Sequence, residues 1–294
     1  MTKPRYLAGV DGGGTGTRVR VTDAAGTPIG HGRAGASALM HGSDRAWQAV
    51  RDALTDAFAQ QGLALPPWQH IALGLGLAGA NNPPWAAAFV EADPGCAALC
   101  LASDALTTLL GAHGGQPGAV VAMGTGSVGL SLDAHGRRRE VGGWGFPAGD
   151  EGSGAWLGLR AAAHLQQVLD GRARADALSH AVAQRCGAVP DSLRTWLGQA
   201  SQGQFASLAP LVLAHAATDA LARSWVTQAA VEVVRLADAL VPQGDLPLSL
   251  CGGLAAPLMP WLPEDFRKRL QPPRGDAADG ALILLRQHLS HTES

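Results

Sequence analysis

The chain has 294 residues, of which 47% are hydrophobic and 16% charged, and its formal net charge is −2. A chain of this length holds about two domains, and its apolar content supports a large core and excludes global disorder. The balanced charge argues against a nucleic-acid or membrane-surface partner, and no run of eighteen apolar residues predicts a membrane span. Because the first residues lead directly into a strand-like segment and not into a secretory signal, we expect a cytoplasmic protein.

The first third of the chain reads as alternating strands and helices. Apolar and alternating runs predict a meander of three strands over residues 6–10, 18–22 and 27–32, whose first bend, residues 11–17, reads DGGGTGT. A helix over residues 43–61, capped by Ser43, a buried strand at 71–77 and a strand at 98–102 follow. Ser103 and Asp104 stand at the junction between the last of these strands and a helix over residues 105–112.

The pattern restarts after residue 118. The GTGT of residues 14–17 reappears 110 positions later as GTGS at 124–127, and Asp-Ala-x-Gly at 23–26 reappears at 133–136. The apolar positions of the two following strands differ by one residue, which either a bulge or a coincidental resemblance would explain. Helices to about residue 240, a strand at 247–250 and a final helix at 276–289 complete the chain. We therefore predict an α/β protein of two domains, residues 1–116 and 117–294, the second with a helical insertion.

The two glycine-rich loops have the chemistry of phosphate cradles. Converging backbone amides and hydroxyl groups bind phosphate oxygens, and the carboxylate of Asp11 beside the first loop would hold Mg²⁺ through water. A two-residue hairpin turn needs one or two glycines, whereas residues 12–16 contain four. Lysine occurs only at positions 3 and 268, so a Walker-type P-loop is missing. Residues 74–79 and 124–129 match GxGxxG, but neither opens a helix, which argues against a dinucleotide site.

Other candidate positions follow from residue type and place. Asp104, at a strand-to-helix junction, suits either the general base of a phosphoryl transfer or a helix N-cap, and spacing alone does not decide. Asp150 and Glu151 stand in a glycine-rich stretch where acids gain little from packing, which favours ligand contact. Gly252 and Gly253 follow a strand and suit either the approach of a flat ligand such as adenine or a helix-capping turn. The scattered histidines and the four cysteines have no metal-ligand spacing.

Four motifs in this order resemble the sugar-kinase branch of the actin–hexokinase superfamily: DGGGTGT at 11–17, GTGS at 124–127, GGWGFPAGDEGSG at 142–154 and CGGL at 251–254. Within it the chain resembles, over nearly its full length, the BadF/BadG/BcrA/BcrD-type group that contains N-acetylglucosamine kinases and bacterial glucosamine kinases. The resemblance implies two actin/hexokinase-like (ribonuclease H-like) domains with an interdomain cleft for ATP and sugar. It also implies phosphorylation of the 6-hydroxyl of an amino sugar by ATP with Mg²⁺. Stretches such as 75–85 and 203–215 are most similar to glucosamine kinases, so glucosamine is the expected substrate and N-acetylglucosamine the alternative.

The resemblance further implies individual roles. Asp104 would be the general base, and Asp11 would orient the metal through water. The expected phosphate-binding residues are Gly13, Gly14, Thr15, Thr17, Gly124, Thr125, Gly126 and Ser127. Gly252 and Gly253 would contact the adenosine, and the expected sugar-binding residues are Asp104, Trp144, Gly145 and Asp150.

The chain departs from this pattern in places, and two other functions remain open. Ala38 stands where family members commonly carry an asparagine, which leaves the exact amino sugar undecided. Related ATPases activate dehydratases or reductases through an iron–sulfur cluster, but Cys96 and Cys100 lie in an apolar segment that does not resemble a cluster site. A sugar-sensing regulator commonly carries a DNA-binding domain, for which residues 1–5 leave no room. By analogy with relatives we expect a homodimer, with a small-molecule substrate as the only other partner.

Overall fold

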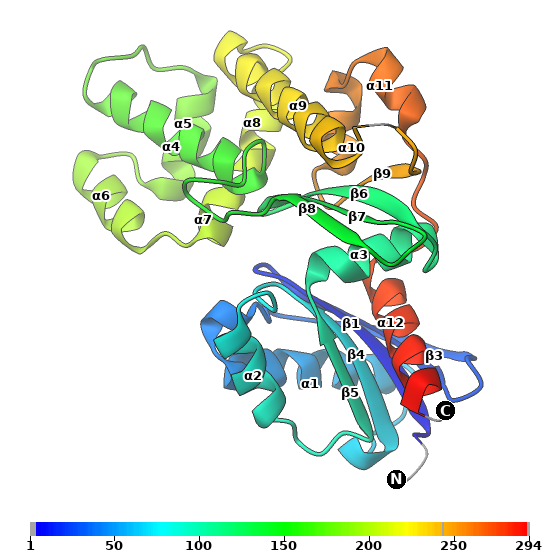
Figure 1. Ribbon diagram of the computed structural model, residues 1–294. Helices are drawn as coiled ribbons and strands as arrows, with labels where there is room; N and C mark the ends of the chain where they lie inside the picture. Colours follow the sequence, from blue (N-terminus) through cyan, green and yellow to red (C-terminus); the bar gives the residue numbers. More distant parts are fainter. Residues whose placement is uncertain (1–3, 243, 293–294) are drawn as a thin grey trace. The chain divides into compact units, whose positions relative to one another are not determined.

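The computed structural model describes residues 4–242 and 244–292, which form two compact units (Figure 1). The first unit contains the described residues up to Gly118, Leu132–Arg137 and those from Pro272 on. The second unit contains Ala119–Ser131 and the described part of Arg138–Gln271. Each unit has a β-sheet with helices packed against it, which confirms the predicted α/β fold class.

The first unit is built on a mixed five-stranded sheet of order β3-β2-β1-β4-β5. β2 pairs antiparallel with β1 and β3, whereas β4 runs parallel to β1 and to β5. Parallel strands end at the same edge of a sheet, so β1, β4 and β5 bring their carboxyl ends together. The strands are β1 (Tyr6–Gly12), β2 (Thr17–Asp23), β3 (Pro28–Ala34), β4 (Ile71–Leu77) and β5 (Ala98–Ala102).

Helices cover this sheet. α1 packs against β2 and β3, where Gly30 and Gly32 leave room for its backbone, and the residue that caps α1 is Gly42 where we expected Ser43. The helical elements are η1 (Leu39–His41), α1 (Ser43–Ala59), η2 (Trp68–His70), α2 (Pro83–Glu91), α3 (Asp104–His113) and α12 (Ala277–Thr292).

The final helix belongs to the first unit, which differs from the predicted assignment of residues 117–294 to one domain. α12 packs against β1, β4 and α3. Gly9 and Gly74 are neighbours in register on β1 and β4, and a Cβ at either would overlap a backbone oxygen of α12. Glycine therefore lets the helix lie directly on the strands. Gly74 and Gly76, two glycines of the GxGxxG pattern, serve this packing, since a Cβ at Gly76 would overlap Thr107 of α3.

The second unit has a four-stranded sheet of order β8-β7-β6-β9, in which β6 and β9 are parallel. Each unit therefore begins with three consecutive neighbouring strands, the first of which also pairs with a later parallel strand. The repeat needs no bulge, because Ser127, Gly129 and Ser131 of β7 are buried as Thr17, Val19 and Val21 of β2 are. The strands are β6 (Gly118–Met123), β7 (Ser127–Leu132), β8 (Arg138–Gly142) and β9 (Leu248–Cys251).

Most of the second unit is helical, and its helices surround the larger hydrophobic core. Among the described residues no single helix is long and apolar enough to span a bilayer; Gln202–His215 and Ala220–Leu240 satisfy that test only as a pair bent by 113°. The helical elements are α4 (Gly154–Leu169), α5 (Ala177–Cys186), α6 (Pro190–Gln199), α7 (Gln202–Ala206), α8 (Ala209–His215), α9 (Ala220–Leu240), α10 (Ala255–Leu258), η3 (Met259–Trp261) and α11 (Glu264–Arg269).

Candidate nucleotide and sugar sites

The loop between β1 and β2 presents backbone amides to open space. The amide of Gly13 donates to the carbonyl of Gly16 at 2.9 Å, and the amide of Ser37 donates to the carbonyl of Gly13 at 3.2 Å. A Cβ added at Gly14 would meet no atom within 4 Å. Within the described chain the amides of Gly14 and Thr15 have no hydrogen-bond acceptor. An open loop with spare N–H donors can bind phosphate oxygens.

Thr17 holds this loop in place. Its side chain is 1% exposed, and its hydroxyl donates to the carbonyl of Gly35 at 2.6 Å and lies 2.8 Å from the hydroxyl of Ser37. A Cβ at Gly12 would overlap that same serine hydroxyl. Thr17 was expected among the phosphate-binding residues, but its hydroxyl is engaged by the segment that follows β3, so the structure favours a role in shaping the loop.

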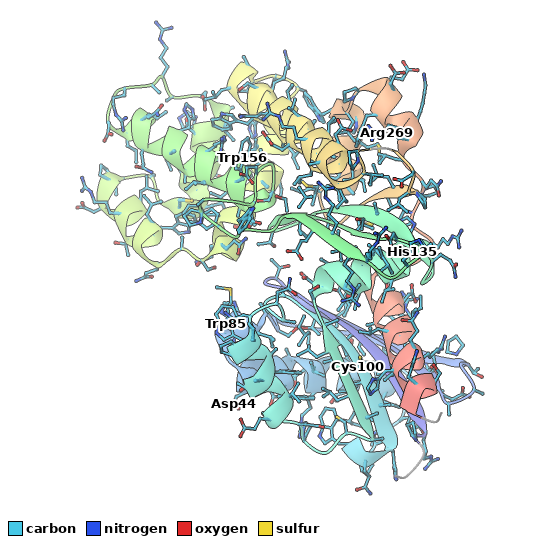
Figure 2. All side chains as sticks on the ribbon, in the orientation of Figure 1. Asp44, Trp85, Cys100, His135, Trp156 and Arg269 are labelled. Carbon is cyan, nitrogen blue, oxygen red and sulfur yellow. The ribbon has the colours of Figure 1, made fainter. Side chains whose placement is uncertain are left out.

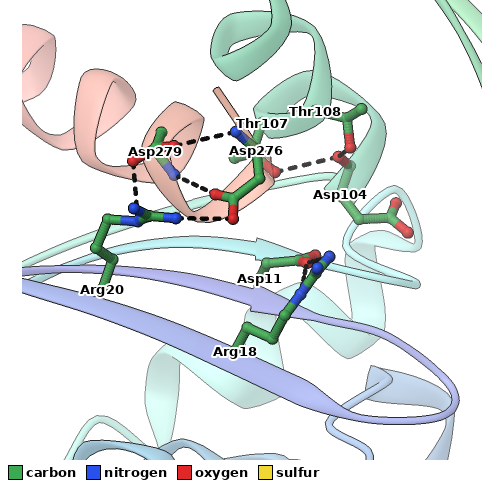
Figure 3. Close-up of polar contacts among 8 residues, drawn as sticks. All are labelled: Asp11, Arg18, Arg20, Asp104, Thr107, Thr108, Asp276 and Asp279. Atoms are coloured by element: carbon green, nitrogen blue, oxygen red, sulfur yellow. Dashed lines mark hydrogen bonds and ion pairs between the residues drawn. The ribbon is translucent and has the colours of Figure 1, made fainter. Parts of the chain in front are cut away.

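Asp11 lies near the end of β1, directly opposite Arg18 of β2. Nε and Nη2 of Arg18 donate to Oδ2 of Asp11 at 3.0 and 2.5 Å (Figure 3). The carboxylate is 15% exposed; burial raises the pKa of Asp11, and Arg18 opposes that rise.

Mg²⁺ fits this position. No group of three or more His, Cys, Asp and Glu side chains among the described residues could hold a metal ion. Mg²⁺ does not require such a cage, because it is commonly held by one or two carboxylates together with substrate phosphates and water. Asp11 beside an open amide loop supplies that donor set.

Asp104 is the first residue of α3 and is not the N-cap of this helix. Ser103 is the cap, since its hydroxyl accepts the amide of Leu106 at 3.3 Å. The carboxylate of Asp104 accepts the amide of Ala105 at 3.0 Å, and its backbone carbonyl accepts the hydroxyls of Thr107 and Thr108, as Figure 3 shows. Because a neighbouring residue serves as the cap, capping does not account for an aspartate at this position.

Asp11 and Asp104 lie at the same edge of the first sheet. Asp11 pairs in register with Gly76 of β4, which pairs with Ala102 at the end of β5. Asp104 follows two residues later. Two strand spacings separate β1 from β5, so the backbones of the two strands that lead to these carboxylates are about 10 Å apart across the sheet.

The loop between β6 and β7 has the same construction in the second unit. The amide of Gly124 donates to the carbonyl of Gly126 at 2.9 Å, and the carbonyl of Gly124 accepts the amide of Gly154 at 2.8 Å. Over the described part of the chain, the amides of Thr125 and Gly126 have no acceptor. Ser127 donates its hydroxyl to the carbonyl of Glu151 at 2.9 Å, which ties the loop to the GDEGSG segment.

The carboxylate of Asp150 anchors this loop through hydrogen bonds. Its Oδ1 accepts the amide of Ser127 at 3.1 Å, and its Oδ2 accepts Nε2 of Gln202 at 2.6 Å. Burial raises the pKa of Asp150, and the hydrogen bonds from Ser127 and Gln202 oppose that rise. The premise that an acid among glycines gains little from packing is wrong here, because Asp150 is 5% exposed and has two partners. The sequence did not identify Gln202 as a partner of Asp150, because a single glutamine 52 residues away offers no sequence signal.

Trp144 contrasts with this buried network. It is 87% exposed, and the two glycines beside it, Gly143 and Gly145, have φ of 71° and 86°. The amide of Gly149 donates to the carbonyl of Gly145 at 2.7 Å and closes the turn. An exposed indole on a glycine turn can rest against the carbon face of a bound sugar.

Gly252 and Gly253 have different roles: the first forms the turn, and the second is open to a flat ligand. Gly252 has φ of 91°, and a Cβ there would overlap the backbone of Met123, so the turn itself requires glycine. The amide of Leu254 donates to the carbonyl of Met123 at 2.9 Å and fixes the turn against β6. A Cβ at Gly253 would meet no atom within 4 Å, so that residue offers open backbone to a ligand.

Comparisons with known proteins agree with these features. The chain matches the BadF/BadG/BcrA/BcrD ATPase family over residues 8–271. It is 35% identical to the glucosamine kinase GspK of Vibrio cholerae over 283 residues, 95% of each chain. A Chromobacterium violaceum structure, provisionally assigned as an N-acetylglucosamine kinase, is 52% identical with a TM-score of 0.91 over 96% of this chain and 99% of its own. A Porphyromonas gingivalis structure with the same provisional assignment shares the fold at 21% identity, with a TM-score of 0.69 over 97% and 99% of the two chains. The chain therefore belongs to the BadF/BadG/BcrA/BcrD ATPase family.

Proposed function

We propose that the protein is an ATP-dependent amino-sugar kinase that transfers the γ-phosphate of ATP to the 6-hydroxyl of glucosamine. Membership of an ATPase family, together with the similarity to a glucosamine kinase and to an N-acetylglucosamine kinase, supports phosphoryl transfer to an amino sugar. The observation that carries the proposal is the edge of the first sheet, where Asp11 and the open amide loop at the end of β1 lie two strand spacings from the end of β5, which Asp104 follows.

The described residues divide the work of phosphoryl transfer. The amides of Gly14 and Thr15 bind the β- and γ-phosphates, and Gly13 shapes their loop. Asp11 holds Mg²⁺ through water, and the bound ion neutralises charge on the phosphates. Asp104 accepts the proton of the attacking sugar hydroxyl, which makes the oxygen a better nucleophile.

The second unit contributes further nucleotide and sugar contacts in this proposal. Its open amides at Thr125 and Gly126 bind phosphate oxygens, with Gly124 and Ser127 as the frame of the loop. The exposed backbone of Gly253 contacts the adenosine, and Gly252 forms the turn that leaves Gly253 exposed. Trp144 and Gly145 contact the sugar, and Asp150 reaches it from the buried network that it shares with Ser127.

Glucosamine is our first choice of substrate because its ammonium group can pair with a carboxylate. Asp104 and Asp150 are both candidate sugar ligands, and the pKa of Asp150 is raised by burial, so a cationic group nearby would stabilise its charge. Ala38, which stands where relatives commonly carry an asparagine, is 3% exposed and offers only a methyl group. N-acetylglucosamine is the alternative substrate.

A coupled assay of ADP release with Mg·ATP tests this proposal on four sugars at matched concentrations: glucosamine, N-acetylglucosamine, N-acetylmannosamine and glucose. We expect the highest kcat/KM for glucosamine. A preference for N-acetylglucosamine would overturn the substrate and leave the kinase assignment. Turnover of none of the four, with ATP still bound, would overturn the kinase assignment and favour the activator or sensor functions.

Asp104→Asn tests the general base. We expect kcat to fall by about 10²–10⁴-fold with little change in ATP affinity, because the variant keeps the acceptor for the Ala105 amide and loses the base. Asp44→Asn is a matched control, since Asp44 is also an acidic residue in the first turn of a helix. Wild-type turnover by the Asp104 variant would refute the assignment.

A further inference from the structure

Arg18 pairs with the carboxylate of Asp11, which the proposed function assigns to metal binding. In Figure 3 its guanidinium lies against Asp11, and Nε and Nη2 both donate to the same oxygen. The pair is fixed by register, because Asp11 and Arg18 are directly opposed on neighbouring antiparallel strands. A hydrated cation held at that oxygen would therefore compete with the guanidinium.

The side chain of Arg18 is free to move. It is 57% exposed, whereas that of Asp11 is 15% exposed. A cavity of about 310 Å³ lies beside it, lined by both Arg18 and Asp276. The neighbouring strand offers no alternative partner, because the residue opposite Arg18 on β3 is Arg33, whose like charge repels it. Asp276 is the carboxylate that lines this cavity together with Arg18.

Asp276, which lines this cavity, is one of two carboxylates that lie beside a single arginine. Asp276 and Asp279 share one guanidinium, with Nη2 of Arg20 at 2.8 Å from Asp276 and Nε at 2.9 Å from Asp279. Burial would raise the pKa of Asp276, but the amide of Asp279 and the charges of Arg20 and Arg18 lower it overall, so this carboxylate stays ionised. Asp276 can therefore accept a second guanidinium.

We propose that Arg18 is a displaceable counter-ion: it pairs with Asp11 in the metal-free protein and moves to Asp276 when a divalent cation binds Asp11. The proposal rests on the proposed function only in taking Asp11 as the metal-binding carboxylate. Leaving a buried carboxylate unpaired costs free energy, and Arg18 neutralises the charge of Asp11 in the metal-free protein. Arg18 then lowers the affinity for free metal, so that the metal binds preferentially with nucleotide phosphates.

Mn²⁺ binding to the full chain tests this without any sugar or turnover. Free Mn²⁺ is measured by electron paramagnetic resonance, with and without ADP, for the wild type and for Arg18→Gln. We expect the variant to bind Mn²⁺ about threefold more tightly without ADP, the size expected for one partly exposed ion pair. Arg33→Gln, which removes the facing arginine, is the control and should change the affinity by much less.

Two further variants test which carboxylates are responsible for the change in Mn²⁺ affinity. Asp276→Asn should weaken Mn²⁺ binding in the wild-type background and have no effect in the Arg18→Gln background, which a double-mutant cycle reveals. Equal or weaker Mn²⁺ binding by Arg18→Gln would overturn the counter-ion role while leaving the proposed function intact. Unchanged Mn²⁺ binding by Asp11→Asn would instead overturn Asp11 as the metal ligand, and both proposals with it.

Discussion

The buried carboxylate of Asp150 allows its structural role and its proposed sugar contact to be separated by two substitutions. Asp150→Ala removes the acceptor for the Ser127 amide and for Gln202. Asp150→Asn keeps an oxygen for Ser127, and the amide of Gln202 can turn so that its own oxygen accepts from the new NH₂ group. Only the alanine variant therefore leaves a buried donor unsatisfied.

The expected destabilisation follows from the hydrogen bonds and the backbone. Losing hydrogen bonds to a charged acceptor costs about 1.5–3 kcal/mol, offset in part because a buried charge is also removed. Asp150 has φ of 60°, a left-handed conformation that aspartate and asparagine tolerate better than alanine, which adds about 1 kcal/mol. We therefore expect a loss of about 2–3 kcal/mol for Asp150→Ala and below about 1 kcal/mol for Asp150→Asn.

Urea unfolding and steady-state kinetics measure the two effects. Asp150→Ala should lower the urea midpoint and raise KM for ATP, because the loop between β6 and β7 loses its anchor. Asp150→Asn should keep the midpoint and KM for ATP but raise KM for the sugar. Glu151→Ala is the control, since the neighbouring side chain is exposed. An alanine variant as stable as the wild type would refute the anchoring argument, and an asparagine variant with wild-type sugar kinetics would refute the sugar contact.

The difference in stability between the wild type and Asp150→Asn should depend on pH. The folded pKa of Asp150 lies above its ordinary value, so the stability contributed by this group is fully present below the unfolded pKa. It is lost as pH rises through the folded pKa. The stability of Asp150→Asn relative to the wild type should therefore increase as pH rises from about 4 through that pKa. A difference that stays constant over this range would contradict the argument.

Two pairs of glycine substitutions test the remaining contacts. Gly252→Ala should lose about 1–3 kcal/mol of unfolding free energy and have a lower urea midpoint, because its φ is positive and its Cβ overlaps β6. Gly253→Ala should keep wild-type stability and weaken ATP binding measured by calorimetry. Unchanged ATP binding by the second variant would refute the adenosine contact. Gly74→Ala should lose about 1–3 kcal/mol because its Cβ enters the backbone of α12, whereas Gly198→Ala, exposed near the end of α6, should gain up to about 1 kcal/mol. Equal stability of the last two variants would refute the close packing of the final helix.

Local patterns predicted the elements that depend on a few neighbouring residues. The strand at 98–102 is found at Ala98–Ala102, and the helix expected at 105–112 is found at Asp104–His113. The repeat of a glycine loop 110 residues on appears as two sheets of the same construction. Backbone propensity and the alternation of buried positions act over short distances, which is why these features can be read from the chain.

Contacts between distant segments could not be predicted in this way. The glycines at 74 and 76 look like part of a nucleotide motif in sequence, and only the packing of α12 and α3 on the sheet explains them. Figure 2 draws the side chains of this unit and labels Cys100 of the neighbouring strand β5. The partner of Asp150 lies 52 residues away on α7. Such pairings depend on which surfaces meet, and no local periodicity encodes them.

Local residue patterns were enough to predict an α/β protein with two glycine-rich loops and a set of candidate acids, because strands, turns and loop chemistry are local properties. Tertiary structure decided which residues those acids contact. It joined the final helix to the first sheet, paired Asp11 with Arg18, and buried Asp150 behind the second loop. These outcomes follow from packing and from the pairing of charges across strands, which depend on the whole folded chain.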